Sequence, residues 1–142
     1  MKTILMVEDE SMLSELFEEF VKMIPDVKYL GCCDEGSKAI DTCVELKPDL
    51  VILDIRLPGI NGLQMLTHLK ETIPATRVII FSGSLDSHTV KMAVESGAAG
   101  FVEKSYGLSE LNRGIIQVLN GGDAYFSVGA RKLARQFVKS DE

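Results

Sequence analysis

Long apolar runs are absent from this sequence of 142 residues. A membrane-spanning helix requires roughly 20 consecutive apolar residues, and no segment approaches that length. The apolar start at Met1–Val7 is followed at once by Glu8, Asp9 and Glu10, so it is too short for the apolar region of a signal peptide. We therefore expect no membrane partner for this chain.

Cysteine is scarce as well, and the three thiols are Cys32, Cys33 and Cys43. An odd number that includes an adjacent pair forms neither a disulfide framework nor a metal-binding spacing. We expect reduced, buried thiols in a cytoplasmic protein. The two histidines, His68 and His88, have no partner at metal-binding or catalytic spacing, and we assign them to packing or to the surface.

An excess of positive charge is also missing, because the formal net charge is −6. A negatively charged chain is not expected to bind nucleic acid nonspecifically by itself. Internal repeats and low-complexity segments are absent too. A length of 142 residues with 46% hydrophobic residues instead suits one soluble globular domain with a hydrophobic core.

What the sequence does contain is an apolar run, Leu50–Leu53, that leads directly into Asp54. A continuous run of Leu, Val and Ile is typical of a strand buried on both faces, as in the centre of a parallel sheet. Asp54 then lies at the carboxyl end of that strand, where α/β sheets place their binding sites. Asn61 follows shortly after and is expected to cap the next helix.

Strand patterns alternate with amphipathic helical patterns five times along the chain, and the connections are short. This alternation predicts an α/β fold, in which helices cover both faces of a parallel sheet. The expected strands cover residues 3–7, 27–33, 50–53, 77–81 and 100–102. Past Gly122 the pattern changes, and we expect a terminal helix outside the alternating unit. That helix contains the basic residues Arg131, Lys132, Arg135 and Lys139.

The carboxyl ends of all strands in such a sheet open onto one edge. The expected strands deliver five polar side chains to this edge: Glu8, Asp9, Asp54, Ser82 and Lys104. Each alone is an ordinary cap or surface residue, but their convergence indicates a site. Clustered carboxylates repel one another and favour a cation, and oxygen ligands suit Mg²⁺ or Mn²⁺ better than zinc. The chemistry indicated is phosphoryl transfer onto Asp54 as the nucleophile.

The same residues belong to a set of motifs: the acidic pair Glu8-Asp9, Asp54 with Pro58-Gly59 and Asn61-Gly62, the pair Ser82-Gly83, and Lys104. With these motifs, residues 2–121 resemble the receiver domain of two-component response regulators. The resemblance implies a flavodoxin-like, doubly wound sheet of five parallel strands in the order 2-1-3-4-5. It also implies a phosphorylation-activated switch rather than an enzyme.

The resemblance further assigns the acceptor and the metal ligands. Asp54 is the expected phosphoacceptor, and a histidine kinase is the expected partner that supplies the phosphoryl group. Glu8, Asp9 and Asp54 are expected to bind the divalent ion, together with the backbone carbonyl of Arg56.

Three further residues are expected to read the phosphoryl group. Ser82 and Lys104 would contact it, and Phe101 occupies the switch-aromatic position of the family. The surface that responds is expected to lie within residues 87–120 and to support a homodimer on phosphorylation. Ser105 stands where the family often has proline, so the isomer of the Lys104–Ser105 peptide bond stays open.

The segment Gly121–Ser127 resembles the junction that precedes a LuxR-like helix-turn-helix domain in transcription factors of the LuxR/NarL-like branch. Only 15 residues follow Ser127, too few for such a domain. We expect residues 1–122 to form the receiver domain and residues 123–142 to be an extension or linker helix. The chain is either a stand-alone receiver that acts through protein–protein contacts or part of a longer regulator. We favour the longer regulator, which would bind DNA only through its output domain.

Three other functions fit the pattern less well. A phosphatase of the haloacid-dehalogenase-like family would need a second Asp where Arg56 stands. A flavodoxin-like FMN carrier would need a glycine- and hydroxyl-rich phosphate loop after the first strand, where Glu8-Asp9-Glu10 would repel a phosphate. A degenerate receiver that serves only as an interaction scaffold would not need the complete acidic set with Ser82 and Lys104.

Overall fold

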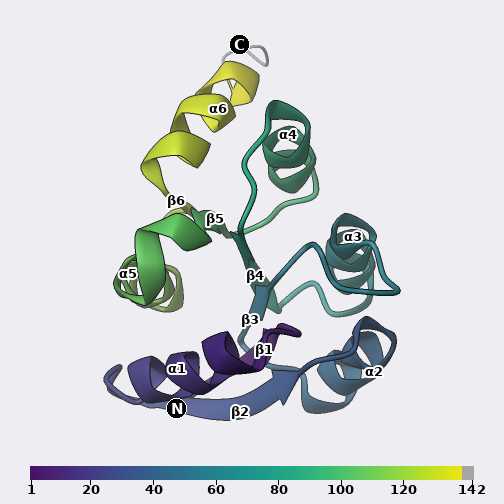
Figure 1. The fold of residues 1–142 in the computed structure, drawn as a ribbon, viewed down its shortest axis with the longest axis vertical. Helices are drawn as coiled ribbons and strands as arrows, with labels where there is room; N and C mark the ends of the chain where they lie inside the picture. The colour runs from purple at the N-terminus through teal and green to yellow at the C-terminus, as the bar shows by residue number, and fades with distance from the viewer. Residues whose placement is uncertain (139–142) are drawn as a thin grey trace.

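The computed structural model describes residues 1–138, in which strands and helices alternate along the chain (Figure 1). The strands are β1 (Lys2–Val7), β2 (Val27–Cys33), β3 (Leu50–Leu53), β4 (Arg77–Ser82), β5 (Gly100–Glu103) and β6 (Tyr125–Phe126). The helices are α1 (Ser11–Val21), α2 (Gly36–Leu46), α3 (Gly62–Thr72), α4 (Ser87–Glu95), α5 (Gly107–Leu119) and α6 (Val128–Val138), and a 3₁₀ turn covers Lys104–Tyr106. The first five strands lie in the segments that the sequence predicted.

Six parallel strands form one sheet in the order β2-β1-β3-β4-β5-β6. The predicted order 2-1-3-4-5 is therefore confirmed as far as β5, but the predicted count of five strands is wrong. In β6, Tyr125 pairs with Gly100 and Phe126 pairs with Phe101. Glycine at position 100 permits this pairing, because a β-carbon there would overlap the Tyr125 carbonyl oxygen. A strand of two residues is too short to show an alternating pattern, so the sequence could not reveal it.

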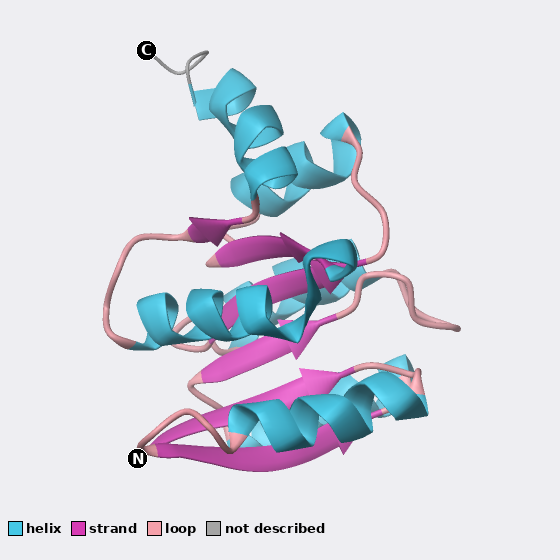
Figure 2. Ribbon diagram, turned by 60° about the vertical axis from the view of Figure 1, so that its left-hand side comes forward, coloured by secondary structure: helices cyan, strands magenta, loops and turns pink. Residues whose placement is uncertain are grey.

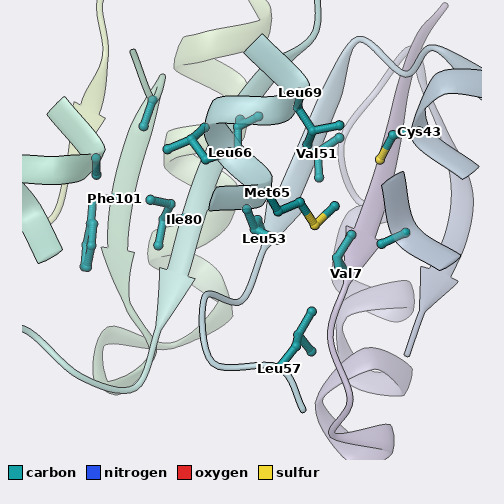
Figure 3. Packing of buried hydrophobic residues seen from close by; sticks show 14 of the residues in the cluster. Val7, Cys43, Val51, Leu53, Leu57, Met65, Leu66, Leu69, Ile80 and Phe101 are labelled. Carbon is teal, nitrogen blue, oxygen red and sulfur yellow. The ribbon is translucent and has the colours of Figure 1, made fainter. Parts of the chain in front are cut away.

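Helices cover both faces of the sheet (Figures 1 and 2). One buried cluster joins α1 and α5 to strand residues such as Ile52 and Ile79. The other joins α2, α3, α4 and α6 to the alternate strand residues, such as Val51 and Ile80, and Figure 3 shows part of it. All four residues of β3 are buried, as the apolar run predicted. Within residues 1–138, none of the helices is both long and apolar enough to span a membrane.

The helix α6 does not lie outside the alternating unit, so that expectation is wrong. It follows β6 and joins the same helical layer as α4, with Ala130 and Ala134 buried. The expected boundary between residues 1–122 and 123–142 stays a prediction. Lys139 of the predicted basic helix lies outside the described residues.

The loop between β3 and α3 is fixed by two local features. Asn61 caps α3 as predicted, because its Oδ1 accepts hydrogen bonds from the backbone amides of Leu63 at 2.9 Å and Gln64 at 3.3 Å. Gly62 donates a backbone hydrogen bond to the Ile55 carbonyl at 3.2 Å. A β-carbon at Gly62 would lie 2.8 Å from that oxygen, so only glycine allows α3 to begin so close to the segment after Asp54.

The three cysteines are free thiols that differ in exposure. Cys43 is buried, and its burial raises the pKa of the thiol to about 12. Cys33 is half-buried and Cys32 is exposed. The expectation of buried thiols is therefore confirmed for Cys43 and is wrong for Cys32.

Candidate functional site

The parallel register places the carboxyl ends of β1 and β3 side by side. Val7 pairs with Leu53, and the backbone amide of Asp54 donates a hydrogen bond to the Val7 carbonyl at 3.0 Å. Glu8 follows Val7 directly, so Glu8 and Asp54 leave adjacent strands at the same edge of the sheet.

The strands β4 and β5 end at this edge as well. Leu53 pairs with Ile80 on β4, and Ser82 pairs with Glu103 on β5. Lys104 follows Glu103 directly. The fold therefore brings the predicted residues of β4 and β5 to the edge at which Asp54 lies.

Three carboxylates form a cluster at this edge. One oxygen from each of Glu8, Asp9 and Asp54 lies within 4.8 Å of the others. Glu8 and Asp54 are only 2% and 6% exposed, whereas Asp9 is exposed. The cluster thus combines two desolvated carboxylates with an open side at Asp9.

Lys104 is the cation of the cluster. Its Nζ atom lies 2.8 Å from Glu8 Oε1 and donates a hydrogen bond to Asp54 Oδ2 at 3.2 Å. Partial burial alone would lower the pKa of Lys104, but the two carboxylates outweigh that effect and raise the pKa. The other described ion pairs join exposed side chains. The Lys104–Ser105 peptide bond, whose isomer the sequence left open, is trans.

Two backbone amides also hold the carboxylates, and no side-chain pattern could have revealed them. The Arg56 amide donates a hydrogen bond to Asp54 Oδ1 at 3.0 Å. The Glu10 amide donates one to Glu8 Oε2 at 3.1 Å. The Arg56 carbonyl, which the resemblance assigns to the metal, stays a prediction.

The surroundings of Glu8 disfavour its ionised form. Burial raises its pKa most, and the charge of Asp54 adds to the rise, while the Lys104 ammonium and the Glu10 amide offset it in part. Its Oε1 atom accepts no hydrogen bond of good geometry from the described residues, although Lys104 Nζ is close. A buried carboxylate oxygen in this state can accept a further cation.

Ser82 lies at the carboxyl edge of the sheet, as predicted, but its hydroxyl is hydrogen-bonded within the loop that follows β4. It donates a hydrogen bond to the Ser84 carbonyl at 3.0 Å and accepts one from the Ser84 amide at 3.2 Å. Ser82 is fully buried. To contact a group on Asp54, the Ser82 hydroxyl must therefore give up its hydrogen bond to the Ser84 carbonyl.

Phe101 lies three residues before Lys104 on β5, and its side chain is fully buried. It belongs to the cluster on the α2–α3–α4–α6 face, and Figure 3 shows it beside Ile80 on the neighbouring strand. The predicted switch residue therefore occupies an inward position in this structure.

The residues at this edge fit a hard divalent cation. The donors are carboxylate oxygens, and three carboxylates face one ammonium. Mg²⁺ is usually held by one or two carboxylates together with phosphate oxygens and water, which suits a cluster that is open at Asp9. A thiol or imidazole set of the kind that selects zinc is missing from the cluster that the structure describes.

Comparison with known proteins gives a consistent result. The protein-family model of the response regulator receiver domain matches residues 4–116 of this sequence. The chain is 33% identical over 119 residues to the nitrate/nitrite response regulator protein NarL of Escherichia coli K12, a match that covers 84% of this chain and 55% of NarL. It is 35% identical over 96 residues to the DNA-binding transcriptional activator EvgA of the same organism, covering 68% of this chain and 47% of EvgA. The chain thus spans about half the length of these relatives.

A solved structure extends the similarity to the C-terminal segment. The crystal structure of a LuxR-family two-component response regulator from Aurantimonas sp. SI85-9A1 superposes with a TM-score of 0.86 at 26% identity. The superposition covers 99% of this chain and 98% of that one. The superposed region therefore includes β6 and α6.

Proposed function

Because the chain belongs to the response regulator receiver domain family, of the type found in NarL and LuxR-family regulators, we propose that it is a signalling switch activated by phosphorylation of Asp54. The family assignment was predicted from the sequence motifs and gives the chain a role in two-component signalling. The observation that carries the proposal is the placement of the Asp54 carboxylate, which is buried at a strand end between the Arg56 amide and the Lys104 ammonium.

The proposed reaction transfers a phosphoryl group from a phosphohistidine of a histidine kinase. A carboxylate oxygen of Asp54 attacks phosphorus, and an O–P bond forms while the P–N bond breaks. The imidazole leaves with the electron pair of that bond and takes a proton from solvent. Lys104 already contacts Asp54 Oδ2, so its ammonium is positioned to bind an oxygen of the incoming group.

Glu8, Asp9 and Asp54, with the Arg56 carbonyl, are the proposed ligands of Mg²⁺ or Mn²⁺. When bound, the ion neutralises part of the negative charge on the transferred group. The contribution of the protein is to hold these carboxylates at the mouth of the site. Burial of Glu8 and Asp54 limits the water that competes for them.

Ser82 and Phe101 are the proposed elements that read the phosphoryl group. To donate to a new oxygen on Asp54, the Ser82 hydroxyl must leave the Ser84 carbonyl. In this proposal the loop between β4 and α4, whose Ser84 amide also bonds to Ser82 Oγ, moves with it. Phe101 would then change its inward position, and the surface of α4, β5 and α5 would change for use in a homodimer.

The proposed output is transcription control through a DNA-binding domain outside this sequence. The relative EvgA is a DNA-binding transcriptional activator, and the match with this chain covers 47% of its length. The role of α6 as a linker to such a domain is part of this proposal, and the site would act in a cytoplasmic protein.

The test is chemical phosphorylation followed by mass spectrometry. With Mg²⁺ and a small phosphodonor, the wild type is expected to gain one phosphoryl group that hydroxylamine removes, as an acyl phosphate requires. Asp54→Asn should gain none, whereas Asp49→Asn, an equivalent change at the other end of β3, should gain the group normally. Full labelling of Asp54→Asn would refute the assignment of the acceptor.

A further inference from the structure

The helix α6 covers part of the face formed by α4 and β5. Ala130 and Ala134 are buried there, and Leu133 and Phe137 pack against the same cluster. Lys91 of α4 lies with its Nζ atom 6.0 Å from the centre of the Phe137 ring. Figure 1 shows α6 beside α4 at one end of the sheet. This packing joins α6 to the cluster that contains Phe101.

The first turn of α6 is hydrogen-bonded to the end of β5, directly before Lys104. The Ser127 amide donates to the Phe101 carbonyl at 2.9 Å, and the Glu103 amide donates to Ser127 Oγ at 3.3 Å. Ser127 is fully buried, so water does not compete for these bonds. The strand that carries Phe101 and leads into Lys104 therefore cannot shift without disturbing the start of α6.

The start of α6 also touches the Glu103 carboxylate and the loop that follows Ser82. A β-carbon on Gly129 would overlap Glu103 Oε1 and would lie 2.8 Å from Leu85 Cδ2. Glu103 Oε1 is buried and accepts no hydrogen bond from the described residues, and it lies where the positive end of the helix dipole favours a negative charge. The contacts of α6 thus include both segments that must move when a phosphoryl group is read.

We propose that α6 is a clamp that holds the receiver in its unphosphorylated arrangement and is released when Asp54 is phosphorylated. This inference rests on the proposed function. In the docked state, α6 keeps Phe101 inward and holds the β4–α4 loop through Leu85. Movement of Ser82 and Lys104 toward the phosphoryl group displaces that loop and the end of β5, and so removes the support of the first turn of α6.

Release of the clamp would also decide when the α4–β5 surface is available. While α6 covers this surface, a second copy of the chain cannot use the same area. The proposed homodimer would therefore form only after α6 leaves. Coupling between the two events is reciprocal: the factor by which a bound phosphoryl group favours release of α6 is also the factor by which release of α6 favours binding of that group.

The experiment uses beryllofluoride with Mg²⁺ as the phosphoryl mimic on the full chain. Amide exchange within residues 128–138 is measured with and without it, and its affinity is obtained by ¹⁹F NMR titration. In the wild type, beryllofluoride should speed exchange in α6 at least about tenfold. In Ala134→Glu, which places a charge in the buried face of α6, exchange should be fast from the start, and beryllofluoride should bind about fivefold tighter or better.

Gln136→Glu introduces the same residue on the exposed side of α6 and should behave like the wild type. Glu103→Gln, which weakens the contact at the start of α6 and leaves the core unchanged, gives a second probe if Ala134→Glu does not fold. Its exchange rate and affinity should shift in the same direction by a smaller factor.

The outcomes separate the clamp from the proposed function. If beryllofluoride binds the wild type but leaves exchange in α6 unchanged, the clamp is refuted and the phosphoacceptor site stands. If exchange in α6 is faster in Ala134→Glu or Glu103→Gln while the affinity equals that of the wild type, the coupling is refuted. If beryllofluoride does not bind the wild type, the proposed function fails and the clamp fails with it.

Discussion

The two ends of β3 carry two aspartates in opposite electrostatic settings. At the amino end, Asp49 Oδ2 accepts hydrogen bonds from the Thr3 amide at 2.8 Å and the Thr3 hydroxyl at 3.2 Å, and the Asp49 amide donates to that hydroxyl at 3.0 Å. These neutral groups on the neighbouring strand satisfy Asp49. At the carboxyl end, Asp54 shares one ammonium, Lys104, with the buried carboxylate of Glu8.

This difference teaches how to distinguish a structural carboxylate from a functional one in a single sheet. A carboxylate that receives neutral donors fastens two elements together and needs no ligand. A carboxylate buried beside another carboxylate is left with electrostatic stress that a cation relieves. The pKa shifts of two other carboxylates show the same difference between neutral donors and burial beside another charge. Hydrogen bonds from Thr89 lower the pKa of Asp86 at the start of α4, whereas burial chiefly raises the pKa of Glu8.

The largest expected effect comes from removing the cation at the carboxyl end. Lys104→Met leaves two buried carboxylates without an ammonium and should lower the free energy of unfolding in EDTA by about 2–3 kcal/mol. Lys22→Met, a matched control whose two partners, Glu18 and Glu19, are exposed, should change it by less than about 0.5 kcal/mol. Urea denaturation measures both. Equal effects of the two substitutions would contradict the distinction between the sites.

The next effect concerns the structural aspartate at the amino end. Asp49→Ala leaves the Thr3 amide and hydroxyl without their acceptor and should lower the free energy of unfolding by about 2 kcal/mol. Asp49→Asn keeps an acceptor oxygen and should cost about half as much or less. Mg²⁺ should not alter either difference in urea denaturation. A loss for Asp49→Ala that disappears when Mg²⁺ is added would place Asp49 with the functional carboxylates instead.

The smallest expected effect concerns Asp86, a carboxylate that, like Asp49, accepts hydrogen bonds from neutral donors, and it is tested by changing the pH. Asp86 caps α4 by accepting hydrogen bonds from the Thr89 amide at 2.8 Å and the Thr89 hydroxyl at 2.9 Å, so Asp86→Ala should cost about 1 kcal/mol at pH 7. These bonds lower the pKa of Asp86 below 3.8. Its ionised form therefore contributes stability above pH 3.8, and this contribution is lost as pH falls through the lower folded-state pKa.

Denaturation of both proteins at pH 7 and in the most acidic buffer that keeps the wild type folded measures this change. The difference between wild type and Asp86→Ala should shrink in acid. A difference that grows in acid would show that the carboxylate is not stabilised as described.

The sequence predicted the parts of the molecule whose signals are long or repeated. The apolar run Leu50–Leu53 identified the central strand because a strand buried on both faces excludes polar residues. Because parallel strands share one carboxyl edge, the order of strands and helices was sufficient to bring Glu8, Asp54 and Lys104 together.

Most of the remaining features depend on short segments or on atoms that no side-chain pattern reports, such as the strand β6, which has only two residues. The buried face of α6 does follow a helical spacing, with Ala130, Leu133, Ala134 and Phe137, but the basic residues between them led us to expect a helix outside the alternating unit. The Arg56 amide that holds Asp54 belongs to the backbone. The orientation of the Ser82 hydroxyl depends on the loop after β4, where no periodicity constrains the chain.

The central claim is that the two ends of β3 differ because only the carboxyl end is built for a cation. The most direct test is urea denaturation of the wild type, Asp54→Asn and Asp49→Asn, each in EDTA and then in Mg²⁺ at about ten times its dissociation constant. In EDTA, Asp54→Asn should be more stable than the wild type by about 1–2 kcal/mol, because one of two buried like charges is removed. Mg²⁺ should stabilise the wild type and Asp49→Asn by about 1.4 kcal/mol each and Asp54→Asn by much less. An Asp54→Asn protein that is less stable than the wild type in EDTA, or that gains as much from Mg²⁺, would contradict the claim.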